Sequence, residues 1–157
     1  MDEEGSAGKL ESTMLRALTI AAQVREEVPV GALVLDSQGN EIASAGNRVV
    51  QDDDPMGHAE MIAMKIALRR MSPRSLRGAT LVVTLEPCPM CAYAAREVGI
   101  SQLIFGLANN KTGACGSVFD IARDPRFGPP LEVSSGVLAS ECQALLRAFF
   151  EPRRETR

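Results

Sequence analysis

Two short motifs carry residue types that bind transition metals. The first is His-Ala-Glu at 58–60, which holds the sole histidine of the chain, and the second is Pro-Cys-Pro-Met-Cys at 87–91. Two cysteines three residues apart at the start of a helix can place both sulfurs on one side of the first turn, where one tetrahedral ion can bind them. The helix N-terminus also stabilises thiolates, because its dipole and unpaired N–H groups favour negative charge.

These residues predict a catalytic zinc site. His58, Cys88 and Cys91 give three protein ligands, and three is the number at catalytic zinc ions, which keep a water in the fourth position. Zinc lowers the pKa of that water to about 7, so hydroxide is available at neutral pH. Glu60 lies two residues after His58 and can take a proton from the water and pass it to a leaving amine. We therefore predict a zinc-dependent hydrolytic enzyme with one Zn²⁺ per subunit, and the signature that the two motifs match together makes it a deaminase.

Other interpretations of the cysteines are open at this point. A Cys-x-x-Cys pair beside a strand is also typical of thioredoxin-like redox proteins. Cys115 or Cys142 could supply a fourth ligand and make the site structural, although each suits a buried apolar position. The combination of His-x-Glu with Pro-Cys-x-x-Cys favours catalysis, because it matches the signature of zinc-dependent nucleobase deaminases.

The elements that must position the two motifs follow from the hydrophobic pattern. Helices are predicted at 10–27, 58–71, 88–98 and 138–150. Strands are predicted at 29–35 and 42–46, joined as a hairpin, and at 79–85, 103–105 and 131–133. The intervening loops are 48–57 and 106–116, with a short helical turn at 118–122. This order predicts an α/β protein with one sheet and helices on both of its faces.

Length and composition predict one globular domain. The 157 residues, 45% of them apolar, can bury a continuous core. The acidic start and the lack of a long apolar run predict a cytoplasmic protein without a secretion signal or membrane helix. We expect a single domain over 1–157, with residues 1–9 disordered and 151–157 forming a C-terminal tail.

The charge pattern leaves nucleic-acid binding open. A net charge of −3 excludes a protein that is basic throughout, but local patches decide whether nucleic acid can bind. No acidic residue lies between Met61 and Leu85, where five lysines and arginines occur: Lys65, Arg69, Arg70, Arg74 and Arg77. A solvated helix face is the simpler interpretation of this stretch.

Over about residues 14–154 the chain resembles the bacterial tRNA-specific adenosine deaminases. The metal motifs are shared by the whole cytidine-deaminase-like superfamily. The further matches are Val-Pro-Val-Gly-Ala at 28–32, Asn-Arg at 47–48, Lys-Thr-Gly-Ala-Cys-Gly-Ser at 111–117 and Phe-Phe-x-x-Arg-Arg at 149–154. The resemblance implies a three-layer α/β/α fold around a mixed five-stranded sheet, a homodimer, and conversion of adenosine to inosine at the wobble position of a tRNA anticodon.

The resemblance also implies which residues act on the substrate, with zinc-bound hydroxide attacking C6 of adenine. Matched position by position, the implied substrate contacts are Asn47, Val30 and Ala59 around the base and Lys111, Arg153 and Arg154 along the RNA. Asn47 could instead be a turn residue, Val30 plain core and Lys111 an ordinary loop lysine. The anticodon loop suits this chemistry, because a base must leave its stack before it can react and a loop nucleotide loses little by doing so.

Three positions depart from the family pattern. Asn-Asn at 109–110 stands where the family has Asp, Gly-Pro at 128–129 where it has Asn-His, and Tyr93 where it has Gly. None of them changes the metal motifs, so they bear on substrate choice. An aspartate repels phosphates, whereas an asparagine can donate a hydrogen bond to them. We therefore expect Asn109 to contact the nucleic-acid backbone and to relax selectivity for RNA over DNA.

Two other functions are compatible with the same motifs. A deaminase of a free base or nucleoside, of the guanine or cytosine type, would share the zinc site, and Pro89 between the cysteines resembles guanine deaminases. A non-catalytic zinc module that binds RNA or a partner subunit would have no use for Glu60. Formation of inosine or xanthine from free bases, nucleosides and total tRNA would discriminate among the three.

Overall fold

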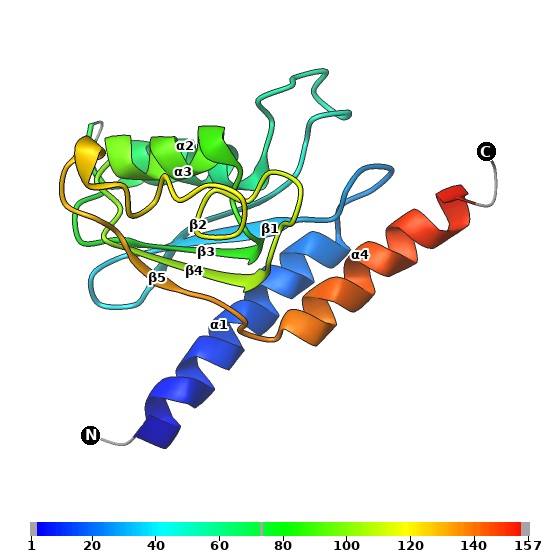
Figure 1. The fold of residues 1–157 in the computed structure, drawn as a ribbon, viewed down its shortest axis with the longest axis horizontal. Helices are drawn as coiled ribbons and strands as arrows, with labels where there is room; N and C mark the ends of the chain where they lie inside the picture. Colours follow the sequence, from blue (N-terminus) through cyan, green and yellow to red (C-terminus); the bar gives the residue numbers. More distant parts are fainter. Residues whose placement is uncertain (1–2, 73, 155–157) are drawn as a thin grey trace.

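The computed structural model describes residues 3–72 and 74–154, which form a three-layer α/β/α arrangement (Figure 1). The five strands, in the sheet order β2-β1-β3-β4-β5, are β1 (Gly31–Leu35), β2 (Glu41–Gly46), β3 (Thr80–Leu85), β4 (Gln102–Leu107) and β5 (Glu132–Ser134). The helices are α1 (Glu3–Ala22), α2 (Ala59–Arg70), α3 (Pro89–Glu97) and α4 (Ala139–Arg154), with a 3-10 turn at Pro125–Phe127. The predicted α/β class and mixed five-stranded sheet are confirmed.

The sheet combines both pairing directions. β1 pairs antiparallel with β2, as the predicted hairpin requires, and antiparallel with β3. β3, β4 and β5 are parallel to one another. Parallel neighbours need a crossover connection, and α3 supplies it between β3 and β4. The carboxyl ends of β2, β3 and β4 therefore lie at the same edge of the sheet as the amino end of β1, and the chain segments that leave this edge can build one site.

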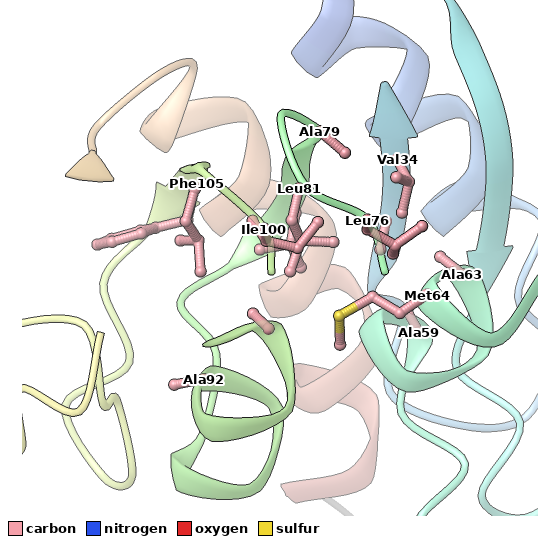
Figure 2. Packing of buried hydrophobic residues seen from close by; sticks show 14 of the residues in the cluster. Val34, Ala59, Ala63, Met64, Leu76, Ala79, Leu81, Ala92, Ile100 and Phe105 are labelled. Carbon is pink, nitrogen blue, oxygen red and sulfur yellow. The ribbon is translucent and has the colours of Figure 1, made fainter. Parts of the chain in front are cut away.

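Each face of the sheet has its own hydrophobic layer. Alternation along a strand sends Leu81 and Val83 to one face and Val82 to the other. The face of Leu81 packs against α2 and α3 through small and medium side chains such as Ala63 and Met64 (Figure 2). The opposite face packs against α1 and α4 (Figure 1).

Two glycines set how closely the second pair of helices approaches the sheet. A Cβ on Gly31 of β1 would lie 2.1 Å from the carbonyl oxygen of Ala17 in α1, and a Cβ on Gly106 of β4 would lie 2.4 Å from the sulfur of Cys142 in α4. The backbone of β1 thus lies nearly against the backbone of α1, and that of β4 against a side chain of α4. A side chain at either glycine would force the layers apart.

The start of the chain differs from expectation. Residues 3–9, which were expected to be disordered, continue α1, whereas residues 1–2 lie outside the described part. Extending an existing helix adds one hydrogen bond for each residue fixed, so the exposed start can propagate from the part anchored by Met14. The helix also ends at Ala22 rather than 27. Glu26 has a positive φ of 61°, which an α-helix does not permit, so the helix could not have continued to 27.

Two later segments differ as well. α4 continues to Arg154, so residues 151–154 of the expected tail are helical and 155–157 lie outside the described part. The carbonyl of Phe149 near its end accepts a hydrogen bond of 2.7 Å from the Arg153 side chain. Residues 118–122 form no helical turn, because their N–H groups donate back to the carbonyls of Gly113 and Ala114.

No helix within residues 3–72 and 74–154 combines the length and apolar character needed to span a bilayer.

Candidate active site

Both metal motifs stand at helix N-termini on the same edge of the sheet. His58 is the N-cap of α2, and Cys88 is the N-cap of α3, with Cys91 in the first turn of that helix. Neither cap side chain makes a hydrogen bond to its own helix backbone. Pro89 begins α3, where a residue without an N–H is tolerated because that position has no intrahelical acceptor. The local sequence therefore begins each helix while leaving the imidazole and thiol available to one another.

The three predicted zinc ligands converge. The Nδ1 atom of His58 lies 3.6 Å from the Sγ atom of Cys88 and 3.5 Å from that of Cys91. One ligand atom from each residue lies within 4.8 Å of the others. Tetrahedral zinc with ordinary bond lengths places such atoms about 3.5–3.8 Å apart, so the residues present fit the ion. Within the described part of the chain, neither Cys115 nor Cys142 belongs to this group, so the site keeps three protein ligands.

The contact between the two thiols shifts their pKa values in opposite directions. The hydrogen bond from the Cys91 thiol lowers the pKa of Cys88 to about 4, and His58 acts in the same direction. The same contact, together with burial, raises the pKa of Cys91. The hydrogen bond with Cys88 likewise raises the pKa of His58. Cys88 is thus a thiolate at neutral pH, which is the form that binds a metal.

Glu60 lies beside this group in the first turn of α2. Its side chain is buried, with 4% of its surface exposed, and burial raises its pKa to about 7. A carboxyl group with a pKa near the working pH can both accept and return a proton. Glu60 lines the same cavity as His58 and Cys88, so the arrangement can combine metal and proton chemistry at one place.

The cavity has a volume of about 400 Å³ and opens at this edge of the sheet. The residues that line it are Glu26, Glu27, Val28, Val30, Asn47, Val49, Val50, His58, Glu60, Leu85, Glu86, Cys88, Asn109, Thr112 and Phe149. A second groove of about 660 Å³ runs beside α1 and β2 and shares Glu26, Asn47 and Val50 with the first. The second groove contains none of the three metal-binding residues, so we assign the chemistry to the smaller cavity.

The residues expected around the base lie in or against this cavity. The side-chain amide of Asn47 donates to the carbonyl of Val28 at 3.1 Å, and its oxygen accepts from the N–H of Ala59 at 2.9 Å. Asn47 therefore ties the end of β2 to the start of α2. One N–H of its amide is left over for a ligand. Val30 is buried, with 4% exposure, and lines the wall, while Ala59 is fully buried behind it.

The residues expected along the RNA divide into two groups. Asn109 lines the cavity, but its side-chain oxygen already accepts from the N–H groups of Lys111 and Thr112 at 3.1 and 3.2 Å. Lys111 is exposed and stands outside the lining residues. Arg153 stacks on the ring of Phe149 at 3.6 Å from its centroid, and Phe149 lines the cavity. Arg154 is exposed in the same helical turn.

Several residues of the site were missed by the sequence analysis. Glu27 and Glu86 are buried carboxylates in the cavity wall, and Phe149 contributes an aromatic ring. The position of Glu86 immediately before the Pro-Cys-x-x-Cys motif was a signal that could have identified it. Glu27 had no comparable signal, because its hydrogen-bond partners are more than 20 residues away along the chain.

The departures at Tyr93 and 128–129 lie away from the cavity lining. The ring of Tyr93 contacts that of Phe127 at 5.4 Å in an edge-to-face arrangement, and its hydroxyl donates to Glu97. The carbonyls of residues 128–129 accept hydrogen bonds of 2.7 and 2.9 Å from Arg96. The loop is thus held through its backbone, which the Gly-Pro pair retains.

The fold and this site define a zinc-dependent deaminase of the cytidine-deaminase class. Residues 8–107 match the family model for the cytidine and deoxycytidylate deaminase zinc-binding region, which with the His-Cys-Cys group assigns zinc as the cofactor. The chain is 41% identical to the tRNA-specific adenosine deaminase of Haemophilus influenzae over 158 aligned residues, covering 99% of this chain and 91% of that protein. The chain therefore belongs to the tRNA-specific adenosine deaminase family.

Solved structures agree with this assignment. A structure from a study of A-to-I editing by tRNA:A34 deaminases at the wobble position of transfer RNA superposes with a TM-score of 0.80 at 37% identity, covering 85% of this chain and 97% of that one. The guanine deaminase of Nitrosomonas europaea superposes with a TM-score of 0.73 over 91% of this chain and 83% of its own. At 21% identity, the second match shows a shared fold and no more.

Proposed function

We propose that this protein deaminates adenosine to inosine in RNA and that its target is the wobble position of a tRNA anticodon. The observation that carries the proposal is the meeting of His58, Cys88 and Cys91 with the buried Glu60 in one open cavity. The near full-length relationship to tRNA-specific adenosine deaminases supports adenosine in tRNA as the substrate.

In the proposed reaction water adds to C6 of adenine and ammonia leaves, so adenosine and water give inosine and ammonia. When bound, zinc supplies the Lewis acidity that activates the attacking water. Glu60 takes a proton as the C–O bond forms and delivers it to the amino group as the C–N bond breaks. Burial raises the pKa of Glu60 to about 7, and a carboxyl group with a pKa near the working pH can both accept and return a proton.

The base is held by groups already in place. Asn47 lines the cavity with one amide N–H left over, which could donate to the edge of the base, and Val30 offers an apolar surface for its ring. Phe149 at the end of α4 adds an aromatic surface at the cavity. We propose that Arg153, Arg154 and Lys111 contact the RNA backbone around the flipped nucleotide, because arginine and lysine bind phosphates.

We also propose that the protein acts in the cytoplasm as a homodimer. Large apolar side chains are exposed on the loop after β4 and on α3, which is typical of a surface that meets another chain. They are Tyr93, Val118, Phe119 and Phe127, each 45–50% exposed.

The reaction is tested by incubating purified protein with an anticodon stem-loop RNA carrying adenosine at the wobble position, and separately with free adenosine and guanine. We expect inosine in the RNA, measured by mass spectrometry of the digested nucleosides. Xanthine from guanine, or inosine from free adenosine alone, would contradict the proposal.

Glu60→Gln should lower the rate on the RNA about 10²- to 10⁴-fold, because the proton shuttle is lost, while the bound zinc measured by mass spectrometry stays at one per chain. Glu11→Gln, on the exposed side of α1, is the matched control and should behave as wild type. A Glu60→Gln protein with full activity would overturn the mechanism.

A further inference from the structure

Two buried glutamates lie in the wall of the substrate cavity without belonging to the metal group. Glu27 is 5% exposed and Glu86 is 1% exposed. Neither takes part in any of the ion pairs found among the described residues. A carboxylate is costly to bury unless its oxygens receive hydrogen bonds, so the donors that surround each one indicate what it does.

Glu27 binds the loop that follows β2. One of its oxygens accepts from the N–H groups of Val49 and Val50 at 2.7 and 3.3 Å, and the other accepts from the N–H of Gln51 at 3.1 Å. Three successive backbone amides of one loop thus converge on a single carboxylate. Val49 and Val50 both line the cavity, and Val50 also faces the neighbouring groove.

Glu86 binds the loop that follows β4. One oxygen accepts from the N–H of Asn109 at 3.1 Å and from the hydroxyl of Ser117, and the other accepts from the N–H groups of Cys115 and Ser117 at 2.9 and 3.2 Å. The loop closes so tightly around this carboxylate that a Cβ on Gly113 would lie 2.5 Å from its carboxyl carbon. This contact explains the glycine of the Lys-Thr-Gly-Ala segment.

The two loops stand on different sides of the site. In the sheet order β2-β1-β3-β4-β5, the central pair β1 and β3 is flanked by β2 and β4, and each flanking strand leads into one of these loops. The loop after β2 gives the cavity Val49 and Val50, and the loop after β4 gives it Asn109 and Thr112. Each wall is therefore shaped by one buried carboxylate.

We propose that Glu27 and Glu86 are positioning residues that hold these two walls at the spacing required by the nucleotides next to the target base. The inference rests on the proposed function, because it concerns how that site selects its RNA. Neither residue touches the reacting atoms. Their effect passes through Val49 and Val50 on one wall and through Asn109 on the other, so it should be seen in substrate binding more than in the chemical step.

The test uses Glu27→Gln and Glu86→Gln, which keep the size of the side chain but turn one acceptor oxygen into an NH₂ donor facing backbone donors. With the anticodon stem-loop RNA as substrate, each variant should raise KM about tenfold or more and change kcat less than about threefold. Bound zinc should stay at one per chain. Glu11→Gln is again the matched control.

Double-mutant cycles with Asn109→Ala separate the two walls. Glu86 and Asn109 act through the same loop, so their effects on kcat/KM should combine to less than the product of the single effects. Glu27 acts through the other loop, so its effect should multiply with that of Asn109→Ala. If Glu86→Gln fails to fold, Ser117→Ala removes one of the donors to Glu86 and should raise KM in the same direction by about threefold.

Failure of this inference and failure of the proposed function give different results. If the wild type is active and the glutamate variants keep its KM, this inference is overturned and the proposed function stands. The same holds if the variants lose kcat and zinc while their KM is unchanged. Fully multiplicative effects of Glu86→Gln and Asn109→Ala would also overturn it. A wild type that makes no inosine from the stem-loop RNA would overturn both.

Discussion

Cys88 is both the N-cap of a helix and a member of the metal-binding group. As the N-cap of α3 it occupies a place where serine or aspartate would normally bind the first backbone amides, but its sulfur turns toward His58 and Cys91 instead. The contact with Cys91 lowers the pKa of Cys88 to about 4. The same contact raises the pKa of Cys91, so zinc binding has to displace the proton of that thiol.

Zinc binding should therefore depend on Cys88 and Cys91 and not on Cys115 or Cys142, which lie outside the metal group. We expect Cys88→Ala to weaken zinc binding by more than about a hundredfold, since removing a ligand costs more than removing one of its supporting contacts. Elemental analysis and competition with a chelator measure this. Cys142→Ala, on the opposite face of the sheet, should keep one zinc per chain, and equal loss in both variants would show that the ligand set is wrong.

Asn109 offers a test of substrate choice with little change in structure. Aspartate can accept the same hydrogen bonds from Lys111 and Thr112 that Asn109 accepts now, so Asn109→Asp should keep the loop. The added charge should repel a nucleic-acid backbone, while the 2′-hydroxyl of RNA can still donate to it. We expect the ratio of rates on matched RNA and DNA hairpins to rise about threefold or more. An unchanged ratio would show that Asn109 does not relax selectivity.

Arg96 connects α3 to the loop between β4 and β5. Its guanidinium donates to the carbonyls of Ile121 and Ala122 at 3.1 and 2.9 Å and to those of residues 128–129. It also lies 5.8 Å from the centroid of the Phe127 ring. One side chain thus satisfies four carbonyls of a segment with little regular structure, and a planar group with several N–H donors suits that task.

Arg96→Ala should lower the free energy of unfolding by about 1–3 kcal/mol, because four carbonyls lose a charged donor. For a chain of this length the midpoint of thermal unfolding should fall by about 3–10 °C, which circular dichroism can follow. Arg69→Ala, on the exposed surface of α2, should shift the midpoint far less. Equal shifts in both variants would mean that the loop contacts add no stability.

Charge is distributed unevenly over the molecule as a whole. Arg69 and Arg70 lie in the last turn of α2, whereas His58 is the N-cap of the same helix, so the length of α2 separates this basic stretch from the metal site. Arg153 instead stacks on Phe149, which lines the cavity. The net charge of −3 gives no general attraction to RNA, so individual cations near the cavity should determine the salt dependence of binding.

We expect Arg153→Ala to raise the KM for the stem-loop RNA and to reduce the slope of log KM against log salt concentration by about 1, because one phosphate contact is lost. Steady-state rates between low and moderate salt give this slope. Arg69→Ala should leave it unchanged. If Arg69→Ala reduced the slope as strongly, the RNA would have to extend along α2.

The metal-binding residues could be predicted from sequence because each of the two motifs is local, although His58 and Cys88 are 30 residues apart and the fold brings them together. The spacing of Cys88 and Cys91 within one helical turn brings two sulfurs together, and the His-x-Glu motif sets Glu60 beside the third ligand. The order of strands and helices also predicted one sheet with helices on both faces, and the resemblance to the family added that the sheet is mixed and five-stranded. The expectation of disorder at the start of the chain did not hold for residues 3–9. Composition alone could not show that an anchored helix such as α1 extends through these exposed residues.

The shape of the cavity was decided only by the tertiary structure. Glu27 and Glu86 bind loops 22–24 and 23–31 residues away in sequence, and Phe149 reaches the site from the last helix. Such contacts depend on the register of the sheet and the packing of its layers, and no local pattern encodes them. The residue types and spacing within the two motifs therefore indicated the metal and the reaction, while long-range hydrogen bonds to buried carboxylates determined the walls that a substrate meets.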